Sequence, residues 1–169
     1  MTFNTTAGQT IDRDLLVAYL NTGTSSSPVW SALGKRVSDS SIEYDWSKET
    51  NQDILGNTYT TLKKPTITQT FDSYPLDGGD TAVLKIWNLV KDQDAAALAA
   101  LDLLIVHAYA GTANTAVYAE RYDACAVEAS SFGGEGGGDI TTTLDVTYGG
   151  TRTQGTASIS GGTVTFTAA

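Results

Sequence analysis

Carboxylates two positions apart are the first residues of this chain whose type and spacing could perform chemistry. Glu43 and Asp45 share one face of an extended strand, because successive side chains of a strand point to opposite faces. Two carboxylates on one face can act as a general acid and a general base when a deep cleft surrounds them. A solvated polar face needs no such cleft, and we interpret the pair as part of one.

A single histidine and a single cysteine limit the catalytic and metal sites that the chain could build. His107 lies in the apolar segment 101–109, with Asp102 as the nearest acid, and Cys125 lies among alanine and valine. A common metal site needs further such ligands, and sequence spacing alone does not support a Ser-His-Asp triad. We interpret His107 as a core or interface histidine and Cys125 as a buried thiol. We therefore expect no enzyme, no metal and no cofactor.

The glycine run at residues 133–139 invites three ligand-binding interpretations, and each fails on its own spacing. A phosphate-binding loop needs a lysine followed by serine or threonine, and neither follows here. A dinucleotide-binding turn needs glycine in place of Asp139 and a helix after it. A calcium-binding β-roll needs aspartate in place of Gly138 and many copies of the motif. The run is therefore read as a wide hairpin turn.

The glycine run joins two segments that predict one long β-hairpin. In residues 122–129, Glu128 faces away from Val127. Residues 140–148 alternate, with Asp145 on the polar face. The opposite face of that second segment carries Ile140, Thr142, Leu144, Val146 and Tyr148. Such a ribbon needs a cover on its apolar face, whereas its carboxylate-bearing face looks onto water.

An earlier stretch begins a second long hairpin of the same kind. Residues 37–46 alternate, and Tyr44 and Trp46 fall on the face opposite Glu43 and Asp45. This second hairpin, like the first, has one face that needs a cover and one that carries carboxylates.

The connection within the second hairpin is the polar segment 47–58, which we interpret as a long loop. Its apolar residues are Ile54 and Leu55. The return strand, 59–71, is rich in threonine and contains Pro65, which implies a bulge or a sheet edge. Two long two-faced hairpins are more β-ribbon than a small monomer needs.

Asp80 is a candidate N-cap for a helix over residues 81–91, because its carboxylate can accept bonds from backbone N–H groups of the first turn. The apolar residues of this helix recur at helical spacing: Val83, Ile86, Trp87 and Val90. The helix would cover the hairpins. We expect Trp87 to pack against Tyr44 and Trp46, so that these three residues form the core seam between the helix and the strands of the hairpins.

Further elements complete a single predicted domain that spans residues 1–169. A short helical turn is possible at 95–100, and strands are expected at 15–20, 28–33, 101–109 and 156–167. Residues 1–13 are expected to form a flexible N-terminal arm, and residues 149–169 the C-terminal strands. With about eight to ten strands and one principal helix, the sequence predicts an α+β, mainly β fold, a β-sandwich or barrel with one flanking helix and two long hairpins.

The composition excludes several functional classes. The net charge of −9 over 169 residues argues against a nucleic-acid binder, which needs a basic surface. One cysteine allows no internal disulfide. The amino-terminal residues lack the pattern of a signal peptide, and the longest apolar run is too short to cross a bilayer. We expect a protein that is made and folded in the cytoplasm and has no membrane partner.

Three segments carry a family resemblance over residues 16–148: PVWSALGKRVSDSSIEYDWSKETNQDILGNTY, the helix after SYPLDGGD, and YDACAVEASSFGGEGGGD. Together they resemble the major tail tube proteins of long-tailed, non-contractile bacteriophages. The most specific parts are GKRVSDSSIEYDW with the ILG that follows, and VEASSFGGEGG. The residues after 148 carry little that identifies the family.

The resemblance implies a structural protein of the virion tail, assembled in the host cytoplasm. In that family six subunits form a ring, and each contributes two hairpins to a β-barrel wall with the helix outside it. The rings stack into a tube around the tape-measure protein, and DNA later leaves through the tube. The implied partners are other copies of the chain, the tape-measure protein, and the tail terminator and initiator proteins.

Within such a tube the polar faces of the hairpins would line the channel. An acidic wall repels phosphates, so that DNA passes without specific binding. The candidate channel-facing carboxylates are Glu43, Asp45, Glu128 and Asp145. The loop 47–58 would reach a neighbouring ring, with Ile54 and Leu55 as the inter-ring contact.

Two other functions remain open from the sequence. The first is the tube protein of a contractile tail or a tailocin-like injector, which shares the same ring and channel. The second is a monomeric β-sandwich module that binds carbohydrate or a cell surface. Such a module would carry aromatic residues on exposed loops, whereas Trp30, Trp46 and Trp87 are predicted in regular elements.

Overall fold

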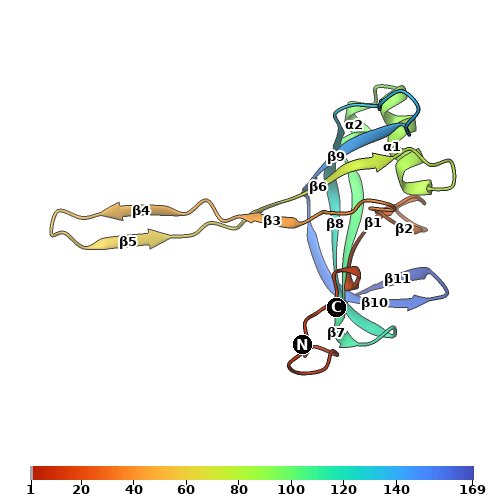
Figure 1. The fold of residues 1–169 in the computed structure, drawn as a ribbon. Coiled ribbons are helices and arrows are strands. Elements are labelled where there is room, and N and C mark those ends of the chain that lie inside the picture. Colours follow the sequence, from red (N-terminus) through yellow and green to blue (C-terminus); the bar gives the residue numbers. More distant parts are fainter. Residues whose placement is uncertain (1) are drawn as a thin grey trace.

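The computed structural model describes residues 2–169 and is built around two long antiparallel strands, β7 (Leu101–Thr112) and β8 (Ala116–Ala129) (Figure 1). Residues 103–106 of β7 are all buried, because both faces of this strand are covered. A continuous apolar run is typical of a strand covered on both faces. The predicted central strand at 101–109 is therefore confirmed.

The antiparallel sheet around these two strands has nine strands within the described residues. Its main path runs β2 (Trp30–Ala32), β1 (Leu16–Asn21), β7, β8, β9 (Thr141–Tyr148), β6 (Thr66–Pro75) and β3 (Ile42–Asp45). The strands of residues 2–169 do not close into a barrel. The predicted fold class, α+β and mainly β with a flanking helix, is confirmed.

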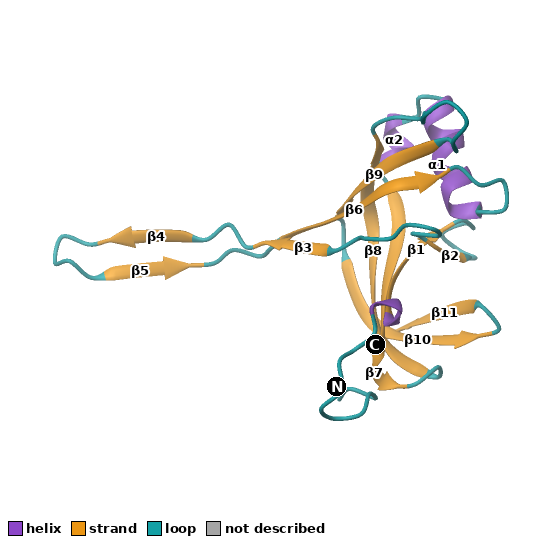
Figure 2. Cartoon of the chain, in the orientation of Figure 1, coloured by secondary structure: helices purple, strands orange, loops and turns teal. Residues whose placement is uncertain are grey.

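The sheet divides along β8. Residues 117–122 of β8 pair with β10 (Arg152–Ser160), which pairs in turn with β11 (Thr163–Ala168). Residues 126–129 pair instead with β9. Figure 2 shows the result: the β9–β6 branch and the β10–β11 hairpin diverge from the common strands.

Two hydrophobic cores fill the two sides of this divided sheet. The larger core joins Val83 and Ile86 of the helix α1 (Thr81–Lys91) to the sheet, including Leu144 of β9. The smaller core lies among β2, β7, β8 and the β10–β11 hairpin, and its members include Trp30. Both cores draw residues from β7 and β8.

The helix α1 begins where the sequence predicted. Asp80 caps it, accepting hydrogen bonds from the backbone N–H groups of Ala82 (3.0 Å) and Val83 (3.3 Å). The hydroxyl of Tyr74 donates a further bond of 2.7 Å to the same carboxylate. A short helix, α2 (Ala95–Leu98), follows, and a 3-10 turn, η1 (Arg13–Leu15), precedes β1.

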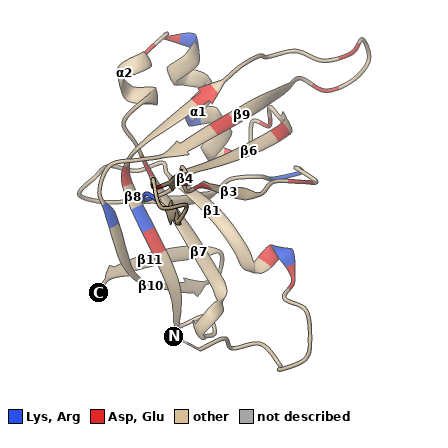
Figure 3. Cartoon of the chain, turned by 90° about the vertical axis from the view of Figure 1, so that its left-hand side faces the viewer, with Lys and Arg blue, Asp and Glu red and all other residues tan. Residues whose placement is uncertain are grey.

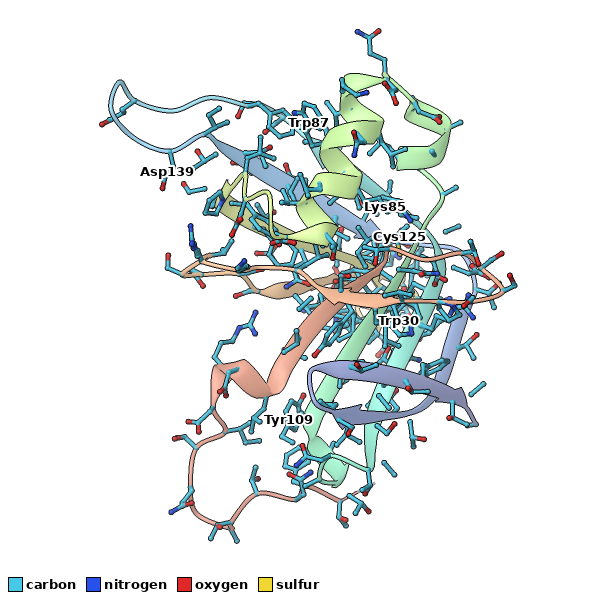
Figure 4. All side chains as sticks on the ribbon, turned by 90° about the vertical axis from the view of Figure 1, so that its right-hand side faces the viewer. Trp30, Lys85, Trp87, Tyr109, Cys125 and Asp139 are labelled. Atoms are coloured by element: carbon cyan, nitrogen blue, oxygen red, sulfur yellow. The ribbon has the colours of Figure 1, made fainter. Side chains whose placement is uncertain are left out.

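The predicted core seam of three aromatic side chains is wrong for the single chain. Tyr44 and Trp46 are 46% and 48% exposed and stack on each other, with ring centroids 6.3 Å apart. Trp87 is only partly buried and lies on α1 beside Lys91, whose Nζ is 5.8 Å from the ring centroid (Figure 4). The helix covers the sheet with Val83 and Ile86 instead, and none of the three aromatic residues belongs to the larger core.

The segment predicted as a loop at 47–58 forms most of a separate hairpin that projects far from the body (Figures 1 and 2). Its strands, β4 (Glu49–Gln52) and β5 (Thr58–Thr61), pair only with each other. We call residues 46–65 the arm. The predicted return strand 59–71 is interrupted between β5 and β6, near Pro65, which has no N–H to donate to a ladder.

The N-terminal segment lies against the end of β7. The backbone N–H of Gly111 donates to the carbonyl of Thr2 and that of Asn4 to the carbonyl of Tyr109, both at 2.9 Å. Phe3 packs its ring edge-on against Tyr109. Residue 1 of the predicted N-terminal arm lies outside the described residues, and the flexibility of residues 1–13 stays a prediction.

Candidate functional site

The four predicted channel-facing carboxylates lie on one face of the sheet. Strands β3, β6, β9 and β8 are neighbours in that order, and we call them the wall. Glu43 pairs with Thr68, and Glu128 lies directly opposite Asp145. Side chains of paired residues share a face, as do residues two positions apart. The register therefore places Glu43, Asp45, Glu128 and Asp145 together on the exposed face of the wall.

The pair formed by Glu128 and Asp145 sets two like charges opposite each other, an arrangement that destabilises a sheet unless solvent screens it. Both side chains are exposed, and Thr70 donates a hydrogen bond of 2.7 Å to Asp145. On the opposite face of the same strands Val127 and Val146 are buried in the larger core. The wall thus has one acidic face in solvent and one apolar face under α1 (Figure 3).

Each side of the wall ends in an unpaired strand edge within residues 2–169. β3 pairs with β6 alone, and its outer edge has no partner. On the other side the pairing of β7 with β8 ends at Leu101 and Cys125, so residues 126–129 pair only with β9. A groove of about 490 Å³ lies beside this second edge. We call it the β8 groove; its lining includes Val90, Ala95, Leu98, Ala99, Ala126, Glu128, Ala129 and Asp145.

The two apolar residues predicted for the inter-ring contact are at the tip of the arm. Ile54 is fully exposed and Leu55 is 81% exposed. The turn beneath them is held by Asp53, whose carboxylate accepts bonds from the N–H groups of Leu55 and Asn57 and from the hydroxyl of Tyr59, at 2.8–3.0 Å. These bonds, those from Asn57 first, lower the pKa of Asp53. The tip therefore presents two aliphatic side chains on an ordered turn beside an ionised carboxylate.

A buried polar cluster on β8 and β10 escaped the sequence analysis. Glu120 is only 7% exposed, and its carboxylate accepts hydrogen bonds from Arg152 Nε (2.6 Å) and the hydroxyl of Tyr122 (2.8 Å). Burial raises the pKa of Glu120, but His107, Arg152 and Tyr122 together lower it by more, so the net shift is downward. The cluster joins residues far apart in sequence, and neither alternation nor spacing could indicate it.

His107 is partly satisfied in this cluster. Its Nδ1 lies 2.8 Å from the hydroxyl of Tyr109, as expected for a structural histidine. Its buried Nε2 lies 3.4 Å from Glu120 Oε1 without a hydrogen bond of good geometry. Because 3.4 Å is long for such a bond, we regard the contact as electrostatic.

A second groove, of about 540 Å³, lies between the base of the arm and the polar cluster. We call it the arm-base groove. Its lining residues come from the arm and the adjoining strands, from β8 and from the β9–β10 connection: Tyr44, Trp46, Lys64, Pro65, Thr66, Ile67, Glu120, Tyr122, Tyr148, Gly149, Gly150 and Arg152. Trp46 lies one residue beyond β3, which corrects the prediction that all three tryptophans lie in regular elements.

Residues 2–169 show neither a metal-binding cluster nor a helix that could span a membrane. They contain no group of three or more histidine, cysteine, aspartate or glutamate side chains arranged to hold a metal ion. Among the same residues, no helix has the length and apolar character needed to cross a membrane.

Comparison with known proteins shows the fold but no family. No family model matches the chain, and no curated protein is similar in sequence. A solved structure of the sheath/tube terminator of an extracellular contractile injection system, PVC, has a TM-score of 0.53 and 9% identity, covering 88% of this chain and 99% of that one. The PVC sheath–tube complex (TM-score 0.48, 11% identity, 96% and 95% covered) and the tube-terminating cap of the anti-feeding prophage (0.47, 14%, 98% and 96%) are more distant. The chain therefore shares the fold of the PVC sheath/tube terminator, and this likeness does not point specifically to non-contractile phages.

Proposed function

We propose that this protein is a structural subunit whose copies close into rings and stack into the hollow tube of a phage tail or a tail-like injection machine. The observation that carries the proposal is the wall, which has an acidic exposed face, an apolar buried face and an unpaired edge at each side. Unpaired edges are a liability in a monomer, because they pair with other chains. Pairing between copies removes both edges at once.

Ring closure joins the outer edge of β3 in one copy to residues 126–129 of the next. Each edge offers four residues, and the β8 groove leaves room beside the second edge. If six copies join, as the sequence resemblance implies, four strands from each give a barrel of about 24 strands, which is too wide for side chains to fill. A water-filled channel results.

The acidic face lines this channel in the proposed assembly. Every carboxylate of one copy recurs around the ring by symmetry. Glu43, Asp45, Glu128 and Asp145 then form circles of negative charge that keep phosphates from the wall. DNA, preceded by a tape-measure protein, passes through without specific binding.

Two kinds of machine contain such a tube. The sequence resembles tubes of long-tailed, non-contractile phages, whereas the fold supports the contractile kind, because the similar structure with a TM-score of 0.53 belongs to a contractile injection system. The two machines differ in that a contractile one has a sheath protein and a non-contractile one does not. Mass spectrometry of particles that contain this protein will find a sheath protein in the contractile case and none in the other.

A tube terminator is the second candidate. The PVC chain with the TM-score of 0.53 is itself a sheath/tube terminator, and this chain matches 99% of its length. A terminator forms a ring but ends the stack, so purified copies would give single rings rather than long tubes.

Electron microscopy of negatively stained, concentrated protein tests the proposal. Hollow tubes support the tube subunit, and isolated rings support the terminator. A preparation that stays monomeric at high concentration, with no ring in any image, contradicts both and favours the carbohydrate-binding or cell-surface module.

Hydrogen exchange tests the closure. The amides of residues 42–45 and 126–129 that face the free edges should exchange quickly in the monomer and slowly in rings. Residues 155–157 of β10, paired on both sides within one chain, serve as the control and should not change.

A further inference from the structure

The arm carries a projecting apolar tip at one end and an aromatic groove at the other. We propose that the tip of one copy, Ile54 and Leu55, docks in the arm-base groove of a second copy. The inference rests on the proposed function in one respect, that copies of this chain assemble, and it names the surface on which the arm acts. It requires no bound ligand and no other protein.

The tip is built for a contact that the single chain does not make. Ile54 and Leu55 are the most exposed large aliphatic residues among those described. The hydrogen bonds to Asp53 fix the turn that presents them, so little freedom is lost when it docks. Removing both side chains from water favours the docked state.

The arm-base groove offers a matching apolar surface. Tyr44 and Trp46 form one side and are about half exposed although they stack on each other. Tyr122 and Tyr148 also line the groove, and the rings of this second pair are 5.2 Å apart. Half-exposed aromatic side chains beside a groove of about 540 Å³ are typical of a site that a partner fills.

Charge favours this groove over the β8 groove. Asp53 carries a negative charge at the tip, and its lowered pKa keeps it ionised. The arm-base groove contains Lys64, which forms no salt bridge within residues 2–169. Arg152 also lines this groove but is paired with Glu120 of the same lining, so the attraction for Asp53 comes from Lys64. The lining of the β8 groove includes Glu128 and Asp145 and no basic residue, so it repels the tip.

The tip cannot reach the groove of its own chain. Eight residue steps lead from Trp46 to Ile54, and β4 (Glu49–Gln52) forms the middle of this segment. At about 3.3 Å per residue it spans up to roughly 25 Å, and the arm points away from the body (Figure 1). The contact is therefore between copies and joins two different surfaces. A contact of this type leaves one tip and one groove free, so it can repeat along a stack of rings.

Cysteine cross-linking tests the contact directly, because the native Cys125 is buried. One batch of protein carries Leu55→Cys and the other Pro65→Cys, at a partly buried residue that lines the arm-base groove. Mixed, assembled and oxidised, the two batches should give a disulfide-linked dimer on a non-reducing gel. The matched control replaces Pro65→Cys with Thr147→Cys, on an exposed threonine of the β8 groove, and should give no cross-link.

A charge reversal provides an independent measurement. Lys64→Glu should abolish the cross-link at low salt, whereas Lys48→Glu, at the base of the arm but outside the groove, should leave it unchanged. Cross-linking through Thr147→Cys instead of Pro65→Cys, or through neither, overturns the inference while leaving rings and tubes as evidence for the proposed function. Absence of any ring or tube in the untreated protein contradicts the proposed function itself.

Discussion

At the scale of single residues, the buried cluster around Glu120 links two strands that alternation alone would leave unrelated. Arg152 on β10 and Tyr122 on β8 both donate to the same carboxylate oxygen, Oε2. A buried charge is tolerated only when it is paired and hydrogen-bonded. The cluster thus ties β10 to β8 and stiffens one side of the arm-base groove.

The cluster predicts an acid-dependent stability. The pKa of Glu120 lies below its ordinary value of 4.5, because its polar partners outweigh the effect of burial. The carboxylate therefore stabilises the fold above pH 4.5, and this stabilisation is lost as the pH falls towards the folded pKa. Glu120→Gln should lower the free energy of unfolding at neutral pH and change it less at about pH 3. Urea titrations of both proteins test this, and an equal difference at both pH values contradicts it.

The buried thiol gives a second prediction at this scale. Burial raises the pKa of Cys125 to about 11, so the reactive thiolate is scarce at neutral pH. A thiol reagent should modify the folded protein slowly and the urea-unfolded protein quickly. Rapid modification of the folded chain would show that Cys125 is accessible.

At the scale of elements, α1 and the arm have opposite relations to the body. The helix buries Ala82, Val83 and Ile86 against the sheet, whereas all the residues of β4 and β5 are exposed. The helix therefore contributes to the stability of one copy, and the arm contributes to contacts between copies.

A prediction for α1 compares the loss of stability at two adjacent residues, Ile86 and Trp87. Ile86 is completely buried, so Ile86→Ala should cost about 2–4 kcal/mol of unfolding free energy. Trp87 is only partly buried, and Trp87→Ala should cost clearly less despite its larger side chain. Chemical denaturation measures both, and the reverse order would place Trp87 in the core.

The arm prediction separates folding from assembly. Ile54→Asp combined with Leu55→Asp should leave the stability of the monomer nearly unchanged, because both side chains are exposed. The same double variant should lose the ability to form tubes, since it places charge in an apolar contact. The control, Ile54→Val with Leu55→Met, stays apolar and should still assemble. Tubes of normal length from the aspartate variant would contradict the role of the tip.

At the scale of the whole molecule, the sequence predicts what depends on local pattern. The N-cap residue Asp80 predicted the start of the helix, and the alternation from Thr142 to Tyr148 predicted β9. Both predictions succeeded because a buried face repeats apolar residues at the period of its element. The β4–β5 hairpin has no alternation of buried and exposed residues, because every residue of its two strands is exposed. The arm-base groove and the Glu120 cluster combine distant segments, so only the register of the folded sheet could reveal them.

The acidic face gives the prediction that belongs to the assembled molecule. Tubes of the unmodified protein should not retain a short DNA duplex at low salt, because the channel wall is negative. Glu43→Lys combined with Glu128→Lys should still form tubes and should retain the duplex until the salt concentration rises. Filtration of tubes with labelled DNA at two ionic strengths measures this. No retention by the lysine variant would show that these residues face outward.

The division of the sheet along β8 has a mechanical consequence. One end of this strand belongs to the wall and the other to the β10–β11 hairpin, and each end lies in a different core. β8 is continuous and pairs with at least one neighbouring strand along most of its length, which limits its bending, so the two branches hold a fixed angle to each other. A long tube built from such rigid subunits cannot curve by deforming the subunits themselves. Its curvature must come from small displacements at the contacts between copies. The arms, which join one copy to another, would limit each displacement.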